Sequence, residues 1–183
     1  MRKPLIVIDP GHGGRDSGAC YSGLREKNIV LAISLFLGGF LQPDYNCVFT
    51  RTSDIYIPLK DRVFIANNYN ASIFISIHTN ASKSHKARGE ELWIYPGSRK
   101  GMKLAKAIAT YIDDIVSGRF RGIKENTFYV LRYTKVPALL IEVGFLDTPE
   151  TPLVDTGTQL KAAFQISKGI RKYFGSRPRR LLS

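Results

Sequence analysis

LIVIDPGHGG, residues 5–14, joins a short apolar run to a glycine-rich turn that contains a histidine. The run from Leu5 to Asp9 is rich in β-branched residues and is too short for a helix, which predicts a buried strand. Glycines allow the chain to bend sharply after this strand and leave space beside the imidazole of His12. The segment therefore predicts a strand whose carboxyl end carries a histidine.

Strand-like and helix-like segments alternate along the rest of the chain. Their apolar runs are nearly continuous, as expected for strands that are covered on both faces. This alternation predicts an α/β domain with a mostly parallel sheet. Pro58 suits the first turn of a helix, and Gly175 is expected to end the last one. We expect further strands at 46–50, 73–78, 91–95 and 138–144, and helices at 26–41, 58–69, 102–116 and 158–174.

The size and composition fit one folded domain. The chain has 183 residues, of which 44% are hydrophobic, and this length is enough to bury a substantial core. We expect a monomer in which residues 1–175 form the domain and residues 176–183, rich in arginine, form a mobile basic tail. Cys20 and Cys47 lack the spacing of a zinc ribbon or a redox pair, so both are expected to be free thiols.

Neither a signal peptide nor a membrane span is predicted. The N-terminal apolar run is only a few residues long, and no small-residue cleavage site follows it. The longest apolar stretch, from Ile29 to Leu41, is interrupted by Ser34 and two glycines. It is too short to span a bilayer and suits a core helix, so stable membrane insertion is not expected.

The charge of the chain predicts an anionic partner. Lys and Arg number 27 against 15 Asp and Glu, which gives a formal net charge of +12 and a pI near 9.9. Nucleic acid, anionic lipid and an anionic cell wall would each suit this charge. No recognised nucleic-acid-binding motif accompanies it, so a nucleic-acid partner is not expected.

Two further polar groups accompany apolar strands. His78 lies in SIHTNA, residues 76–81, directly after an apolar run, and Glu142 lies inside LLIEVGF, residues 139–145. Ligands of open α/β sheets bind beyond the carboxyl ends of the strands, so His12, His78 and Glu142 are expected to meet at one edge. A glutamate among apolar neighbours is costly to bury unless it is paired or functional.

A metal ion held by two histidines needs a third ligand, and Glu26 is the best candidate because a predicted helix fixes its position. Two imidazoles and a carboxylate form a zinc site with a fourth position left for water. Plainer interpretations exist, because strand-end histidines are commonly structural and the helix dipole favours Glu26 at a helix start. Glu142 is the hardest to explain in structural terms. Together these residues suggest a hydrolytic zinc site.

Several short motifs keep an order and spacing that are far more specific than any one of them. They are IDPGHGG (8–14), DSGA (16–19), EKN (26–28), TR (50–51), Leu59 with Arg62, AN (66–67), FISIHTNA (74–81), GEE (89–91), VLR (130–132), PA (137–138) and EVGFL (142–146). On these motifs the chain resembles, from about Leu5 to Tyr173, the zinc-dependent N-acetylmuramoyl-L-alanine amidases of the type-3 class, found in autolysins and phage endolysins.

The resemblance implies one zinc ion at His12, Glu26 and His78 and a catalytic role for Glu142. It also implies a single α/β domain in which helices cover both faces of a twisted central sheet of about six strands. The implied substrate is the amide that joins N-acetylmuramic acid to L-alanine of the peptidoglycan stem peptide. Small departures from the family pattern, such as Thr79 after the second histidine, do not involve a proposed ligand.

Metal chemistry suggests that Glu142 accepts a proton from the attacking water and delivers it to the leaving amine. A zinc peptidase that acts on stem peptides and a non-catalytic wall-binding module are the alternatives. Peptidoglycan and the anionic surface of the cell wall are the expected partners, and the positive charge would keep the protein there. Short length without a signal peptide favours synthesis in the cytoplasm and release as a phage or prophage lysin, while roles in sporulation and cell separation stay open.

Overall fold

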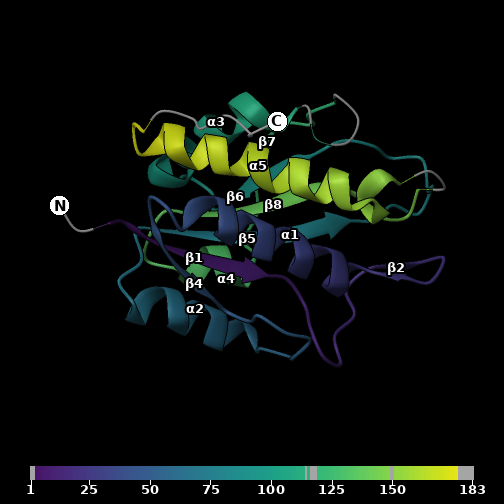
Figure 1. Cartoon of the computed structure of the whole chain (residues 1–183), viewed down its shortest axis with the longest axis horizontal. Helices are drawn as coiled ribbons and strands as arrows, with labels where there is room; N and C mark the ends of the chain where they lie inside the picture. The colour runs from purple at the N-terminus through teal and green to yellow at the C-terminus, as the bar shows by residue number, and fades with distance from the viewer. Residues whose placement is uncertain (1–2, 114, 116–118, 149–150, 177–183) are drawn as a thin grey trace.

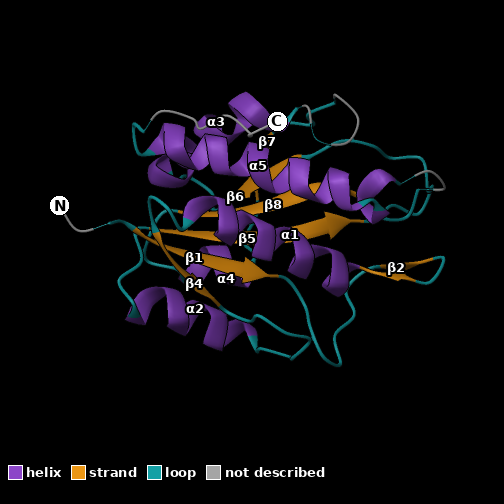
Figure 2. Ribbon diagram, in the orientation of Figure 1, coloured by secondary structure: helices purple, strands orange, loops and turns teal. Residues whose placement is uncertain are grey.

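The computed structural model describes residues 3–113, 115, 119–148 and 151–176. Figures 1 and 2 show a central sheet between layers of helices. In chain order the elements are β1 (Leu5–Pro10), β2 (Cys20–Tyr21), β3 (Leu24–Arg25), α1 (Glu26–Leu41), β4 (Asn46–Phe49), α2 (Leu59–Asn68), β5 (Ile73–Asn80), β6 (Glu91–Ile94), α3 (Arg99–Ile112), β7 (Ile123–Glu125), α4 (Tyr129–Tyr133), β8 (Ala138–Phe145), a short 3-10 helix (Pro152–Val154) and α5 (Thr156–Tyr173).

Six strands form the central sheet, in the order β4-β1-β5-β8-β6-β7. β1 pairs in parallel with β4 and β5, and β5 pairs in parallel with β8. β6 runs antiparallel to β8 and parallel to the edge strand β7. The predicted α/β domain with a mostly parallel sheet of about six strands is therefore confirmed. Because β1, β5 and β8 are parallel neighbours, their carboxyl ends lie at one edge of the sheet.

The side chains of each central strand alternate between two apolar cores, one on each face of the sheet. Ile6 and Ile8 belong to the larger core, which α1, α3 and α5 cover, whereas Val7 belongs to the smaller core under α2 and α4. In Figure 1, α5 lies above the sheet and α2 below it. Because both faces are covered, apolar residues are needed at nearly every strand position, which explains the continuous apolar runs.

The ends of α3 differ from the prediction. The helix begins at Arg99 rather than Met102, because the hydroxyl of Ser98 caps it by accepting a hydrogen bond from the backbone N–H of Gly101. It ends at Ile112, whereas the predicted end at residue 116 lies outside the described residues. A polar and basic first turn therefore precedes the amphipathic stretch on which the prediction rested.

Short elements escaped the sequence-based prediction. The β2–β3 hairpin, β7 and the five-residue α4 lie in segments without sustained periodicity. Pro58, which was expected in the first turn of α2, is instead the capping residue before it, with ψ of 147°. Of the expected basic tail, only Ser176 lies within the described residues.

Two other expectations can be compared with the structure. Cys20 and Cys47 both lie within the described residues and are free thiols, as predicted. None of the helices in the described part of the chain combines the length and the apolar character that crossing a membrane requires.

Two adjacent glycines near the end of α1 allow a matched test of its packing. A Cβ atom on Gly38 would overlap the ring of Phe49, whereas one on Gly39 would meet no described atom within 4 Å. Gly38→Ala is expected to lower the free energy of unfolding by about 1–3 kcal/mol, because overpacking displaces the ring. Gly39→Ala should raise it by about 0.5–1 kcal/mol through helix propensity. Urea unfolding measures both, and changes of the same sign would contradict this packing.

Candidate metal centre

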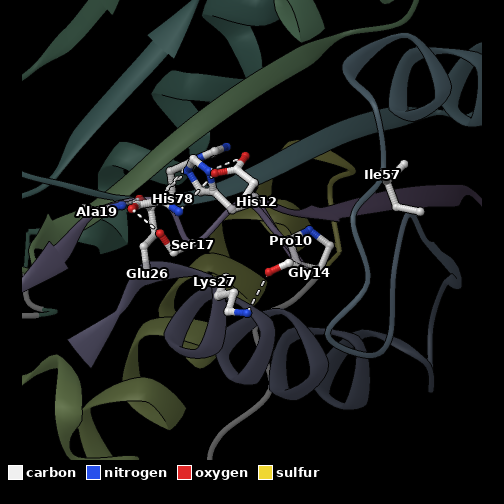
Figure 3. A network of polar contacts seen from close by, with 12 residues as sticks. Pro10, His12, Gly14, Ser17, Ala19, Glu26, Lys27, Ile57 and His78 are labelled. Carbon is white, nitrogen blue, oxygen red and sulfur yellow. Dashed lines mark hydrogen bonds and ion pairs between the residues drawn. The ribbon is translucent and has the colours of Figure 1, made fainter. Parts of the chain in front are cut away.

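The sheet brings three of the predicted residues to one edge. His12 follows β1, His78 lies near the end of β5 and Glu142 lies in β8, and these three strands are neighbours. His78 and Glu142 are paired in register, so their side chains lie on the same face of the sheet. Glu26 is the first residue of α1. In Figure 3 the side chains of His12, Glu26 and His78 converge.

The polar atoms of these three residues lie at distances suited to a metal ion. Glu26 Oε1 is 3.2 Å from Nε2 of His12 and 3.0 Å from Nδ1 of His78. One ligand atom from each residue lies within 4.8 Å of the other two, and the described residues contain no other such group. Zinc bonds of 2.0–2.1 Å in tetrahedral geometry separate the ligand atoms by about 3.3 Å. The three residues therefore fit a zinc ion.

Neighbouring groups orient the candidate ligands. His12 Nδ1 lies 2.9 Å from Oδ2 of Asp16, an ion-pair contact that is not aligned as a hydrogen bond, and Nε2 lies beside Glu26. The backbone N–H groups of Ala19 and Thr79 donate to the two Glu26 oxygens at 2.8 and 2.9 Å. Carboxylate and backbone partners of this kind orient metal ligands in zinc proteins. Asp16 was not predicted as a site residue, although it lies only four positions after His12.

Close packing around glycines shapes the loop after β1. His12 has φ of 59°, a left-handed conformation that is uncommon for residues other than glycine. A Cβ atom on Gly11 would overlap the imidazole of His78, and one on Gly18 would lie 2.5 Å from Oε2 of Glu26. The space that the glycines were predicted to leave beside an imidazole is therefore occupied by the candidate ligands themselves. Such strained conformations persist where the surrounding structure enforces them.

Two buried arginines hold the same loop through its carbonyl oxygens. Arg62 donates to the carbonyls of Pro10 and His12, both at 2.6 Å, and to Oδ1 of Asp9 at 2.8 Å. Nε of Arg51 donates to the same Pro10 carbonyl at 3.1 Å. Both arginines belong to the motifs that carried the family resemblance, but sequence alone gave them no role. Arg62 fixes the backbone at the strained residue that supplies an imidazole to the cluster.

The electrostatics of the cluster favour a cation. Burial disfavours the charged imidazole of His12, but hydrogen bonds and attraction to Glu26 and Asp16 outweigh burial and raise the pKa of His12. Burial alone would raise the pKa of the Glu26 carboxyl, yet hydrogen bonds from His12 and His78 hold that pKa well below its usual range. The carboxylates that favour a proton on His12 would equally favour a metal ion, which would displace that proton on binding.

Glu142 is a buried acid beside this cluster. Burial raises the pKa of its carboxyl to about 7, from an ordinary value of 4.5; His78 opposes this rise and Glu26 adds to it. Oε2 of Glu142 makes no hydrogen bond to the described residues. A carboxyl with a pKa near 7 can both accept and donate a proton at neutral pH.

One cavity connects Glu142 with the two histidines. Its volume is about 370 Å³, which is within the range of small-molecule sites. Apolar and aromatic side chains around the start of α2 and the start of α4 supply much of its lining. These lining residues were not predicted from the sequence. These residues are Tyr56, Ile57, Leu59, Phe128, Tyr129 and Val130.

The raised pKa of Glu142 predicts a pH-dependent stability in protein treated with a chelator. The folded state binds this proton more tightly than the unfolded chain, so the stabilisation is complete below pH 4.5 and is lost as the pH rises through about 7. Between about pH 5 and pH 8 the wild type should lose roughly 2–3 kcal/mol more unfolding free energy than Glu142→Gln, which does not titrate. Urea unfolding at the two pH values measures the difference, and equal losses would contradict the raised pKa.

Comparison with known proteins gives extensive matches. A family model described as N-acetylmuramoyl-L-alanine amidase matches residues 6–172. The sporulation-specific N-acetylmuramoyl-L-alanine amidase of Bacillus subtilis (strain 168) is 43% identical over 147 residues; the match covers 78% of this chain and 56% of that protein. The crystal structure of an N-acetylmuramoyl-L-alanine amidase from Clostridium difficile 630 is similar with a TM-score of 0.91 and 40% identity, covering 96% of this chain and 99% of the other.

A second solved structure agrees with the first. The catalytic domain of CwlV, an N-acetylmuramoyl-L-alanine amidase from Bacillus (Paenibacillus) polymyxa var. colistinus, is similar with a TM-score of 0.89 and 34% identity, covering 95% of this chain and 99% of that domain. The present chain spans about half the length of the B. subtilis relative but nearly all of each solved structure. The chain therefore belongs to the N-acetylmuramoyl-L-alanine amidase family.

Proposed function

We propose that this protein is a zinc-dependent hydrolase that cleaves the amide between N-acetylmuramic acid and L-alanine in peptidoglycan. The observation that carries the proposal is the convergence of His12, Glu26 and His78 at one point, together with the buried carboxyl of Glu142 in the cavity that the two histidines also line. Membership of the amidase family supports this amide as the substrate.

His12, Glu26 and His78 would hold one zinc ion. When bound, zinc supplies a Lewis acid that lowers the pKa of water to about 7 and polarises a carbonyl oxygen. The negative charge of Asp16, 2.9 Å from Nδ1 of His12, would favour the proton on Nδ1 and leave Nε2 free as a ligand. The arginine contacts to the loop carbonyls would keep the His12 imidazole in place.

Glu142 would move the protons of the reaction. Its ionised carboxylate accepts a proton from the attacking water, and its protonated form then donates to the departing amine of L-alanine. The unpaired Oε2 is available for this role, and no covalent bond between protein and substrate is needed. The apolar residues around the cavity would exclude bulk water and orient the substrate for attack.

The setting of this reaction would be the bacterial cell wall. All four site residues come from one chain, so a monomer with residues 1–175 as its catalytic domain would suffice. Peptidoglycan is the proposed partner of the cavity.

Metal analysis of the purified protein, combined with mass spectrometry of digested peptidoglycan, tests the proposal. We expect about one zinc ion per chain, loss of digestion on chelation, and recovery on adding zinc. The digest should contain stem peptides whose L-alanine has a free amino group, and muramic acid that carries no peptide. Cleavage within the stem peptide, with the muramoyl–alanine amide intact, would identify a peptidase instead. Binding to the wall without release of any product would identify the protein as a non-catalytic wall-binding module.

A further inference from the structure

Two helices on the face of the sheet away from α2 and α4, α3 and α5, carry a concentrated positive charge. α3 and α5 pack directly on each other, with Gly169 against Ile108, and lie side by side in Figure 1. Each helix contains four Lys or Arg residues and no Asp or Glu. α2 and α4 contribute lining to the catalytic cavity from the opposite side of the sheet. A ligand on α3 and α5 would therefore leave the cavity open.

Three lysines of these two helices line one hollow, and a fourth shares the ring of Tyr111 with one of them. Together they form one surface, which we call the α3–α5 basic face: Lys103, Lys106, Lys168 and Lys172. Lys103, Lys106 and Lys172 are exposed and, with Tyr173, line a surface hollow of about 320 Å³. An anionic group in this hollow could therefore be approached by all three lysines.

Aromatic and hydroxyl groups hold three of the four ammonium groups over the two helices. Nζ of Lys168 lies 4.5 Å from the ring centre of Tyr111, and Nζ of Lys103 lies 5.8 Å from that of Tyr173. Nζ of Lys172 donates to the hydroxyl of Thr110 at 2.9 Å. Contacts of this kind orient a lysine without neutralising it, so the surface keeps its charge.

The helix dipole favours Lys172 in the last turn of α5, but it does not account for the cations of α3. Arg99 and Lys100 open α3, where the helix dipole disfavours cations by about 0.3–1 kcal/mol each. Mutual repulsion among like charges also destabilises a compact protein. Of the four cations in α5, Arg171 does have a structural role, since it is buried and forms an ion pair with Asp44 at 2.8 Å.

We propose that the α3–α5 basic face binds a linear phosphodiester polymer of the cell wall. Regularly spaced phosphates on a flexible chain match a row of lysines that extends over two adjacent helices, and binding would hold the enzyme beside its substrate. The choice of a wall polymer rests on the proposed function. Nucleic acid has the same phosphate chemistry, but single strands also need aromatic faces for base stacking, and ammonium groups already lie over Tyr111 and Tyr173.

Co-sedimentation with cell walls rich in poly(glycerol phosphate) tests this inference. Lys103, Lys106, Lys168 and Lys172 are changed together to Gln in the full chain, and the assay contains a chelator so that catalysis plays no part. The matched control removes the same number of charges from exposed lysines elsewhere, at Lys60, Lys83, Lys86 and Lys135. A third variant has Arg at the four positions of the α3–α5 basic face.

At low salt the Gln variant of this face should bind the walls at least tenfold more weakly than the wild type, while the control stays within about threefold and the Arg variant binds normally. The slope of log affinity against log salt should fall by about 0.7 for each phosphate contact removed. Equal losses of wall binding in the face variant and the control would show that binding depends on net charge alone, and would contradict the proposal. Undiminished binding to walls stripped of the phosphate polymer, or equally tight binding of single-stranded DNA, would overturn the proposal. Hydrolysis of a soluble muropeptide, measured separately, reports the proposed function without involving this face.

Discussion

Glu142→Gln is expected to lower the turnover of peptidoglycan by about 10²- to 10⁴-fold, the usual contribution of a general acid–base. The amide has nearly the shape of the carboxyl but cannot accept a proton from water. The variant should still bind one zinc ion, because His12, Glu26 and His78 are unchanged. Turnover is measured from the L-alanine amino groups released, and zinc by metal analysis of the same sample.

A second buried carboxylate provides the control. Glu91 is the register partner of Glu142 on β6. Unlike Glu142, it forms ion pairs, since its Oε1 lies 2.6 Å from Nε of Arg121 and 2.7 Å from Nζ of Lys124. Glu91→Gln should therefore keep turnover within a few-fold of the wild type. Full activity in Glu142→Gln would remove Glu142 from the proposed mechanism, and equal losses in both variants would indicate a general effect of buried charge on the sheet.

Arg62→Met is expected to lower the free energy of unfolding by about 3–5 kcal/mol, as is typical when one partner of a buried ion pair is removed. Its guanidinium is almost fully buried and lies 2.8 Å from the carboxylate of Asp9. Without it, Asp9 keeps only the hydroxyls of Thr50 and Ser76, both at 2.6 Å. Zinc affinity should also fall, by about 10- to 100-fold, because the carbonyl of His12 loses its donor.

The double variant Asp9→Asn with Arg62→Met separates charge from packing. Removing both charges avoids an unpaired buried carboxylate, so the double variant should be more stable than Arg62→Met alone. The coupling free energy comes from urea unfolding of the two single variants and the double. Zinc affinity is measured by competition with a chromophoric chelator. A loss of stability below about 1 kcal/mol in Arg62→Met would contradict the proposed importance of the pair.

Much of the fold could be predicted because long elements have clear hydrophobic patterns. α1 has the predicted bounds, since its apolar residues recur on one face and glycines interrupt only its end. The five-residue α4 and three-residue β7 are too short for periodicity to appear. The antiparallel direction of β6 was equally hidden, because hydrophobicity does not encode strand direction. Tertiary pairing with β8 sets that direction.

The candidate site was predictable where polar residues interrupt apolar strands or directly follow them. His12, His78 and Glu142 stand out for this reason, and the structure brings all three beside Glu26. Arg62 and Asp16 lack such a signal, because each lies in a segment where polar residues are common. Asp9 did interrupt an apolar pattern, because its carboxylate lies at the end of the first apolar strand. The structure explains this carboxylate by its buried ion pair with Arg62.

The candidate ligands come from distant parts of the chain, and this has a consequence for folding. Glu26 and His78 are 52 positions apart in sequence, and they meet only after α1 and β5 have docked on β1. Parallel strands joined by long crossovers form slowly, because loop closure must precede their contacts. The unfolded chain therefore offers no preformed site, and an ion specific for the native state stabilises it by mass action. At a free metal concentration one hundred times the Kd, this linkage adds about 2.7 kcal/mol to the free energy of unfolding. Resistance to heat and to proteolysis would therefore increase with the concentration of the metal ion.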